Sequence, residues 1–389
     1  MMSRLRKARD TLMLRVRPFY HPLRNRLSRE IDLAALRRRR PARHVLIATN
    51  GLDRSGAPKL AVEMAAIYRA EDVEVTVVAP RGGTFHADLK SIGVRVIIDN
   101  QLGKCPSYLR ELARLSNFAI CNTAVIWQIV EVISSAVRTV WYVHEISQTE
   151  ALNAQGCIAA PLASVEAVWA GSELCARLLR PLRDDVAVVP YGLSSIGRCH
   201  DGRPADEPFQ IGVFGTIEPR KGQDFVVDAV ASLDDSLRRK LRVYIFGKMN
   251  DPTFAPQVIA RANADPIIEY CGELDGATYA TAMLQMDAVL VCSRDDTLPL
   301  VSLDALGAGQ MLLLVPSVGT TAWISDGMDA LVGREASRSG VRELIVRAIE
   351  MRSERERIGE AARATFARHF AKEMFRDRLI CQLKSAPPA

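Results

Sequence analysis

Residues 293–309, SRDDTLPLVSLDALGAG, decide the fold, because an apolar strand gives way to a helix here. The strand is predicted over 287–292 and the helix after Pro299. Proline suits the first helical position, since the N–H that it lacks would have no partner there. The backbone N–H groups of Leu300 and Val301 then lie at the positive end of the helix dipole. A phosphate or another anion would bind well at this helix start.

Two carboxylates flank the same helix start. Asp296 lies in the loop before the helix, and Asp304 is predicted one turn inside it. Both could reach a ligand that lies across the helix start. The alternative is that Asp296 only caps the helix and that Asp304 lies on a solvated helix face.

The composition is typical of a globular protein. The chain has 389 residues, 48% of them hydrophobic and 25% charged, and this length favours two or three domains. Its eight cysteines show no metal-ligand spacing, so we expect free thiols in a reducing compartment and no bound metal. No apolar stretch approaches the ~18 residues of a membrane span. We therefore expect a cytoplasmic protein.

The basic character of the chain lies in an N-terminal arm, residues 1–43. Residues 1–44 carry 14 Lys and Arg against 3 Asp and Glu, a net charge of +11, and the remainder carries 37 against 42, a net charge of −5. Arginines alternate in the arm with apolar residues near helical spacing, which is typical of a segment lying on an anionic membrane surface. A disordered tail and a helix packed on the body are the alternatives. Nucleic-acid binding is not expected, because the folded remainder is acidic.

Strands alternate with helices along the chain. In the first half, strands are predicted over 44–49, 73–78, 94–98, 118–121, 138–143, 167–171 and 186–189. After a polar linker, the pattern restarts with strands over 209–214, 241–246 and 267–270. Such alternation predicts an α/β fold with parallel, doubly wound sheets, in which ligands bind at the carboxyl ends of strands. Two such domains in tandem would face a cleft.

Two strand ends in the first half are candidates for ligand binding. Residues 51–58, GLDRSGAP, could cradle an anion before a helix predicted over 59–69, although a plain strand–helix turn also fits. This loop matches neither GxGxxG nor a P-loop, which argues against a nicotinamide cofactor and an ATPase. His144 follows the strand over 138–143 and is either a hydrogen-bonding group in the cleft or a structural residue.

A pair of cations follows the first strand of the second half. In residues 215–224, GTIEPRKGQD, Arg220 and Lys221 precede a helix that is predicted to begin near Phe225. Adjacent cations are often only solvated. At a helix start that faces a cleft they would clamp a diphosphate, with Lys as a point charge and Arg as a bidentate fork.

These pieces occur in an order that resembles the family-4 glycosyltransferases of GT-B fold, over residues 44–370. The motifs that carry the resemblance are SGAP (55–58), WYVHE (141–145), VPYGLS (189–194), GTIEPRKGQD (215–224), CSRDDTLPLVSLDALGAG (292–309) and VGTTAWISDGMDALV (318–332). The resemblance implies two Rossmann-like domains, an acceptor-side domain over 44–194 and a nucleotide-sugar-binding domain over 209–365. It also implies that a C-terminal helix and tail, 366–389, cross back to the first domain.

The resemblance further implies how the donor is held. Lys221, with Arg220 beside it, would bind the donor diphosphate and neutralise the leaving phosphate. Gly56 and Ala57 would offer backbone contacts near the same diphosphate. The family retains anomeric configuration and needs neither a metal nor another cofactor, so cations and helix N-termini would supply the positive charge.

The sugar-facing residues depart from the family pattern. Asp296 and Asp304 would stand at the two acids of a Glu-x7-Glu pair, near the donor sugar hydroxyls and the ribose hydroxyls, but each is one methylene shorter. His144 would contact the transferred sugar near the reacting carbon. Thr216 stands where many relatives have Arg, and Trp323 where an acid is frequent.

Three function classes remain open from the sequence. The first is a hexosyltransferase that uses a nucleotide sugar and acts on a glycan or lipid-linked acceptor, at the inner membrane face. The second is a catalytically silent relative that binds nucleotide or glycan within a membrane assembly, which the Asp-for-Glu changes favour. The third, a nucleotide-sugar epimerase of similar fold, fits the motifs less well.

Overall fold

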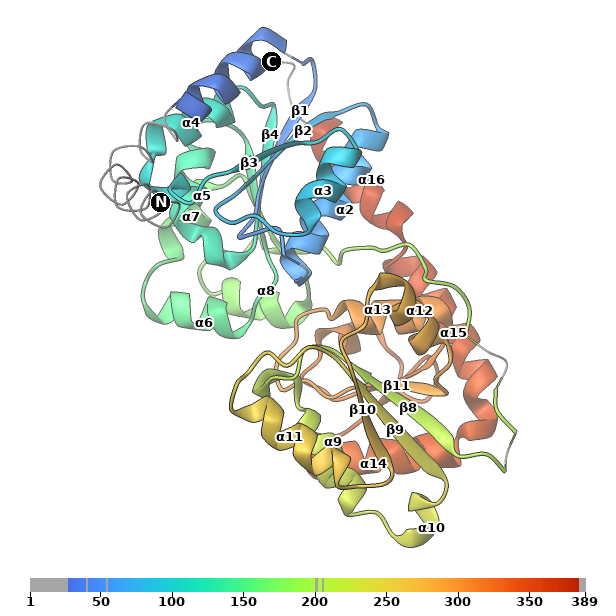
Figure 1. The fold of residues 1–389 in the computed structure, drawn as a ribbon. Coiled ribbons are helices and arrows are strands. Elements are labelled where there is room, and N and C mark those ends of the chain that lie inside the picture. Colours follow the sequence, from blue (N-terminus) through green and yellow to red (C-terminus); the bar gives the residue numbers. More distant parts are fainter. Residues whose placement is uncertain (1–26, 40, 54, 200–201, 205, 385–389) are drawn as a thin grey trace, which may run out of the picture. The chain divides into compact units, whose positions relative to one another are not determined.

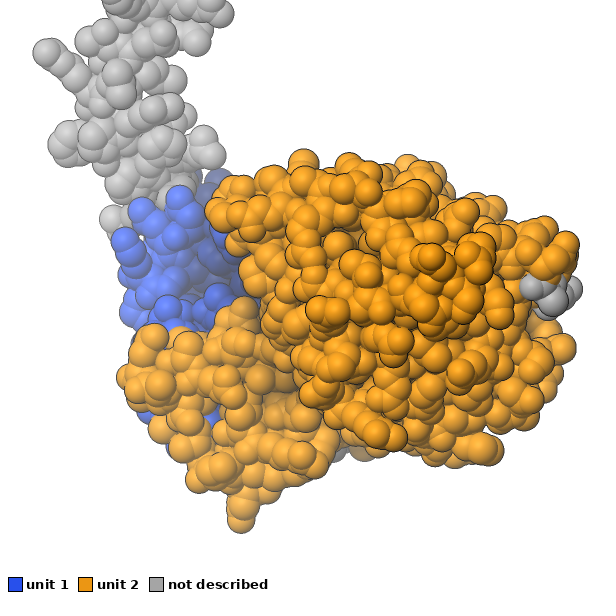
Figure 2. Space-filling model, turned by 90° about the horizontal axis from the view of Figure 1, so that it is seen from below, with its two compact units in different colours: residues 1–141, 160–166, 383–389 blue, residues 142–159, 167–382 orange. Residues whose placement is uncertain are grey.

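A computed structural model describes residues 27–39, 41–53, 55–199, 202–204 and 206–384. These residues form two parallel sheets with helices packed on their faces (Figure 1). The doubly wound α/β fold expected from the sequence is confirmed. Figure 2 shows the two compact units of the chain: residues 1–141, 160–166 and 383–389 form one, and residues 142–159 and 167–382 form the other.

The first sheet has seven strands in the order β3-β2-β1-β4-β5-β6-β7. Its strands are β1 (His44–Ala48), β2 (Glu74–Ala79), β3 (Arg95–Ile98), β4 (Phe118–Asn122), β5 (Thr139–Val143), β6 (Ala167–Ala170) and β7 (Ala187–Val188). The strand order reverses between β1 and β4, so the loops after these two strands meet at one edge of the sheet. The connecting helices are α2 (Gly56–Ala70), α3 (Phe85–Ser91), α4 (Pro106–Arg114), α5 (Trp127–Ser134), α6 (Ser147–Ala154), α7 (Ala159–Ser164) and α8 (Glu173–Leu179).

The second sheet has six strands in the order β10-β9-β8-β11-β12-β13. Its strands are β8 (Phe209–Phe214), β9 (Leu241–Phe246), β10 (Ile268–Gly272), β11 (Ala288–Val291), β12 (Met311–Leu314) and β13 (Leu331–Val332). Here the order reverses between β8 and β11. The helices are α9 (Gln223–Ala231), α10 (Asp235–Arg238), α11 (Phe254–Asn263), α12 (Gly276–Leu284), α13 (Leu300–Ala308), α14 (Arg338–Glu350), α15 (Arg355–His369) and α16 (Lys372–Lys384), and short 3₁₀ turns include η3 (Pro219–Lys221) and η4 (Gly319–Trp323).

Burial explains why the strands read as continuous apolar runs rather than as alternating patterns. Every residue of β1, β4, β5, β11 and β12 is buried. In the second sheet, α9 packs with α11 and α14 as one layer, and α13 packs with α15 as another (Figure 1). A parallel sheet covered by helices on both faces requires apolar side chains on both sides of each strand.

Helix α2 begins three residues earlier than the sequence predicted. Gly56 is its first residue, after Ser55 in an extended conformation, whereas the prediction began at Lys59. The prediction placed the helix start after Pro58. Proline is, however, tolerated within the first turn of a helix, where the N–H has no intrahelical partner. Gly56 and Ala57 therefore lie in the helix start rather than in the preceding loop.

The C-terminal segment consists of two helices, not one continuous run. Helix α15 ends at His369, and after Phe370 and Ala371 the chain continues as α16. The backbone at this break is hydrogen-bonded to the segment after β7, since the N–H of Leu193 donates to the carbonyl of Phe370 at 2.9 Å. Phe375 in α16 is buried, with its ring centroid 6.4 Å from that of Tyr142 in β5. The last helix thus returns to a strand of the first sheet, as expected.

Part of the N-terminal arm is a helix that packs on the folded body. Residues 27–39 are helical, and Leu33 and Leu36 are buried. The guanidinium of Arg29 lies 2.7 Å from the carboxylate of Asp99. The alternative of a packed helix therefore holds for this part of the arm, whereas residues 1–26 lie outside the described residues. Among the described helices, none has the length and apolar character needed to cross a bilayer.

Candidate functional site

The candidate site forms where the strand order of the second sheet reverses. The loop after β8 carries Arg220 and Lys221, and the loop after β11 carries Asp296. Gly222 allows the two loops to touch, because it has a φ of +71° and a Cβ there would lie 2.2 Å from the carbonyl oxygen of Cys292. Such a reversal point is where open α/β sheets bind ligands. The structure thus brings Arg220 and Lys221 together with Asp296, which lies 75 positions after Lys221 in the sequence.

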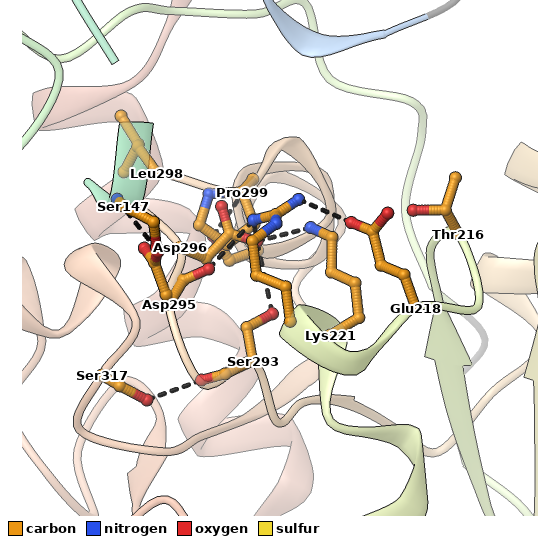
Figure 3. A network of polar contacts seen from close by, with 12 residues as sticks. Ser147, Thr216, Glu218, Lys221, Ser293, Asp295, Asp296, Leu298, Pro299 and Ser317 are labelled. Atoms are coloured by element: carbon orange, nitrogen blue, oxygen red, sulfur yellow. Dashed lines mark hydrogen bonds and ion pairs between the residues drawn. The ribbon is translucent and has the colours of Figure 1, made fainter. Parts of the chain in front are cut away.

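The side chain of Lys221 points at Asp296 (Figure 3). Its Nζ lies 2.5 Å from Oδ2 of Asp296, and the Ser293 hydroxyl donates to the same oxygen at 3.3 Å. The side chains of Lys221 and Asp296 are only 19% and 12% exposed. Partial burial strengthens this ion pair relative to one on an open surface.

Arg220 connects three acidic residues around the ion pair. Its guanidinium lies 3.0 Å from the carboxylate of Glu218 and 3.6 Å from that of Asp296. The same group donates to the backbone carbonyl of Asp295 at 2.9 Å. The side chain of Arg220 is 38% exposed, so an incoming anion can reach it.

Asp295 extends the network to the residues after β5. Its carboxylate accepts from the hydroxyl of Ser147 and, at 3.2 Å, from the N–H of Ser147 at the start of α6. Residues 142–159 belong to the same compact unit as the second sheet. Figure 3 shows Ser147 and Asp295 next to the Lys221–Asp296 pair. The sequence singled out neither residue, although Asp295 lies within the motif over 292–309.

Helix α13 begins at Leu300, so Pro299 is its N-cap and not its first helical residue. Among the residues that the structure describes, no side chain forms a capping hydrogen bond at this helix start, so Asp296 is not merely a cap. Leu300 and Val301, the first two helical residues, are half-buried. Their N–H groups lie at the positive end of the helix dipole, as the sequence predicts.

Asp304 is buried inside α13 rather than solvated. It is 3% exposed, and one of its carboxylate oxygens accepts from the hydroxyl of Tyr279 at 2.8 Å. Desolvation, then the charge of Asp304, raises the pKa of Tyr279 well above its usual value, so the phenol stays a neutral donor. The ring of Tyr279 meets Phe214 edge-on at 5.6 Å, which fixes its direction. The alternative of a solvated helix face for Asp304 is wrong.

His144 follows β5 directly and is half-buried. Its ring meets that of Tyr142 edge-on at 4.1 Å and lies 6.1 Å from that of Tyr191. Desolvation lowers the pKa of His144 to about 3, so the ring is neutral at physiological pH. Gly171 makes room for it, because a Cβ there would lie 3.3 Å from Nδ1. A neutral imidazole suits hydrogen bonding to a ligand, not general acid chemistry.

Gly56 and Ala57 lie in the other compact unit, at the start of α2. The carbonyl of Ala57 accepts from the side-chain amide of Asn122 at 2.8 Å, at the carboxyl end of β4. The side chain of the N-cap residue of α2, Ser55, forms no capping hydrogen bond within the described part of the chain. These two residues thus lie where the strand order of the first sheet reverses, which is the position expected of a ligand loop.

The two further departures from the family pattern have clear consequences. Thr216 follows β8 and supplies only a hydroxyl, so it adds no positive charge near Lys221. Trp323 in η4 packs edge-on against Phe370 at 5.3 Å, which makes it part of the packing around the α15–α16 break. An acidic sugar contact is absent at position 323.

Comparison with known proteins relates the second half of the chain to a known family. Residues 200–365, which contain the site loops of the second sheet, match the family Glycosyl transferases group 1. A curated relative, D-inositol 3-phosphate glycosyltransferase of Stackebrandtia nassauensis, is 26% identical over 180 residues, which is 42% of this chain and 40% of that protein. The chain thus spans about two fifths of the relative that it matches.

Solved structures share the fold over most of this chain. Anabaena HepE in complex with UDP and glucose has a TM-score of 0.74 at 17% identity, covering 88% of this chain and 99% of HepE. A glycosyltransferase of Rickettsia africae has a TM-score of 0.73 at 14% identity, covering 88% and 98%. Sucrose-phosphate synthase of Thermosynechococcus elongatus has a TM-score of 0.69 at 14% identity, covering 88% and 99%. These solved structures show that the chain has the GT-B fold, and residues 200–365 are similar to the group 1 glycosyl transferases.

Proposed function

We propose that this protein is a retaining, family-4 type hexosyltransferase. It transfers a hexose-type sugar from a nucleotide-diphosphate sugar to an acceptor glycan, in the synthesis of a cell-surface polysaccharide or glycolipid. The observation that carries the proposal is the convergence of Lys221, Arg220 and the uncapped start of α13 at the strand-order reversal of the second sheet. These groups concentrate positive charge where a diphosphate binds in such sheets.

The chemistry requires positive charge at this place. During glycosyl transfer, the bond between the anomeric carbon and the diphosphate oxygen breaks, and negative charge develops on the departing diphosphate. In the proposal, Lys221 and Arg220 neutralise this charge, together with the N–H groups of Leu300 and Val301. The acceptor hydroxyl bonds to the anomeric carbon on the same face, and its proton passes to an oxygen of the departing diphosphate. Groups fixed in place before the reaction stabilise its transition state most effectively.

The remaining site residues would hold the donor. Asp296 would accept hydrogen bonds from the sugar hydroxyls, and Asp304, oriented by Tyr279, would accept those of the ribose. Neutral His144 would contact the transferred sugar. Gly56 and Ala57 at the start of α2 would add backbone contacts. HepE was solved with UDP-glucose, which is consistent with such a donor here.

The arm would bring the enzyme to an anionic membrane surface that carries a lipid-linked acceptor. Arg37, Arg38 and Arg39 are exposed at the end of the described arm helix. Leu27 and Ile31 of the same helix are 64% and 60% exposed. Exposed apolar residues beside a cationic run are typical of helices that bind anionic lipid.

One observation favours the second candidate, a catalytically silent relative that binds nucleotide or glycan. Asp296 already forms an ion pair with Lys221. The side chain of Asp296 is also one methylene shorter than the Glu of the family pattern. An acid held so close to the lysine could be retained for stability alone. Slow hydrolysis of a donor without acceptor would exclude this candidate.

A donor panel tests the proposal. Calorimetric binding of UDP, GDP, ADP and dTDP sugars to the wild-type protein should reveal one preferred nucleotide. The same donor should be hydrolysed slowly without acceptor, and NMR of a transfer product should show the anomeric configuration of the donor. Absence of binding across the panel by a folded protein would contradict the proposal, and an inverted product would contradict the retaining mechanism.

A further inference from the structure

Arg294 is a third cation, after Arg220 and Lys221, beside the candidate site, and it contacts protein groups. It follows Ser293 in the loop after β11, with its side chain directed to the neighbouring loop after β8. Its guanidinium donates to both oxygens of Asp224, at 2.9 and 2.5 Å. The same group donates to the carbonyl of Pro219 at 2.5 Å and lies 3.8 Å from the ring centroid of Phe225.

These contacts surround the turn that carries the diphosphate-binding cations. Pro219 opens η3, which contains Arg220 and Lys221, and Asp224 lies in the first turn of α9. One planar guanidinium therefore fixes both ends of a six-residue segment. A bidentate fork combined with stacking on an aromatic ring is a geometry that Arg offers and Lys does not.

Asp296 lies in the same loop after β11, two residues after Arg294. The N–H of Arg294 donates to the carbonyl of Arg220 at 2.8 Å, so the backbones of the two loops are already paired. The contacts of the Arg294 guanidinium with Asp224 and Pro219 further restrain the rotation of one loop relative to the other. It thereby sets the direction from which Lys221 approaches Asp296.

We infer that Arg294, through Asp224, Pro219 and Phe225, is a positioning residue that holds Lys221 in place for diphosphate departure. We call these four residues the Arg294 clasp. The inference rests on the proposed function. A shift of a charged group by about 1 Å can cost about 10²-fold in rate, so loss of the clasp lowers turnover more than it lowers donor binding.

The experiment combines kinetics with hydrogen exchange. Arg294→Met keeps an aliphatic contact with Phe225 but removes the fork, and Asp224→Asn weakens the fork from the other side. With the sugar nucleotide that the wild type turns over in the donor panel, each variant should lower kcat about 10- to 100-fold while KM changes less than about threefold. The double variant should be no worse than either single variant, since the residues act as a unit. Arg294→Lys should recover only part of kcat.

Arg261→Met is the matched control. Arg261 forms an ion pair with Asp228 between α11 and α9, and both side chains are well exposed, at 50% and 36%. This pair lies in the same domain but does not touch η3. Its removal should leave kcat unchanged. A kcat in Arg294→Met equal to that of Arg261→Met would overturn the inference.

Hydrogen exchange of the ligand-free protein separates this inference from the proposed function. Amides over 220–225 should exchange about tenfold faster in Arg294→Met than in Arg261→Met, at an unchanged melting temperature. If no sugar nucleotide is turned over but exchange accelerates, the proposed function fails and the clasp stands. Unchanged exchange over 220–225 would overturn the clasp, whatever the wild-type activity.

Discussion

The carboxylate of Asp296 lies 2.5 Å from the ammonium of Lys221, with the guanidinium of Arg220 at 3.6 Å. In the proposed function, a donor phosphate needs the same two cations. Asp296 is therefore an internal anion on Lys221. The donor diphosphate must displace it from Lys221 before Asp296 can accept hydrogen bonds from the sugar hydroxyls. This exchange of one anion for another keeps Lys221 oriented in the ligand-free protein.

Asp296→Asn should separate nucleotide binding from sugar transfer. Removal of the carboxylate frees Lys221, so the affinity for a nucleoside diphosphate should rise about three- to tenfold. Transfer should fall at least about 10²-fold, because the sugar loses a charged acceptor. Calorimetry with UDP, GDP, ADP and dTDP, together with turnover, measures both effects. Weaker diphosphate binding by Asp296→Asn would contradict the role of internal anion.

Tyr279→Phe should destabilise the second domain and weaken nucleotide binding. Its hydroxyl donates to the buried carboxylate of Asp304 at 2.8 Å, and hydrogen bonds to charged groups contribute about 1.5–3 kcal/mol. Urea unfolding measures the loss of stability. Tyr244→Phe is the control, since no hydrogen bond from the Tyr244 hydroxyl is found among the described residues. Equal stability of the two variants would show that Asp304 does not depend on Tyr279.

The pKa of His144 predicts a specific pH dependence. Burial lowers this pKa from 6.5 to about 3, so between these pH values the unfolded chain binds more protons here than the folded protein. The free energy of unfolding therefore falls as the pH drops below about 6.5. In His144→Asn this decline should be less steep, and wild-type turnover should show no inflection from His144 near pH 6.5. An NMR titration that gives His144 a pKa near 6.5 would refute this prediction.

Membrane association through the arm predicts a dependence on lipid charge. Arg38→Gln with Arg39→Gln should lower binding to vesicles rich in phosphatidylserine about 10- to 30-fold, since each Arg near the surface contributes about 1 kcal/mol. Arg239→Gln with Lys240→Gln, two exposed cations after α10, should leave vesicle binding unchanged. Co-sedimentation measures all three proteins. Equal loss in both double variants would assign the effect to net charge rather than to the arm.

Much of the fold could be predicted from the sequence, because buried parallel strands read as apolar runs between helices. The bounds predicted for β8 and β9 agree with the structure at both ends. The strand β12 was missed although its sequence, MLLL, is apolar, since it follows α13 after only Gly309 and Gln310. A four-residue apolar run has no periodicity that separates it from the end of the preceding helix.

The site was predictable only in part. Motif and charge pointed to Arg220, Lys221 and Asp296, and these three lie together in the structure. The partners that orient the site were not predictable. Arg294 and Asp224 are 70 residues apart, and nothing in their local sequence indicates that the ends of β8 and β11 bring them into contact. Such pairings depend on strand order and on side-chain direction, which a single sequence does not specify.

Calorimetry on Lys221→Ala tests whether Lys221 binds the donor diphosphate. The preferred nucleotide of the wild type should bind the variant at least tenfold more weakly, and turnover should fall about 10²–10³-fold, as for the loss of one transition-state donor. Lys240→Ala, which removes an exposed lysine of the same domain, should bind and turn over like the wild type. If Lys221→Ala keeps the affinity and turnover of the wild type, the diphosphate lies elsewhere and the account of this site is wrong.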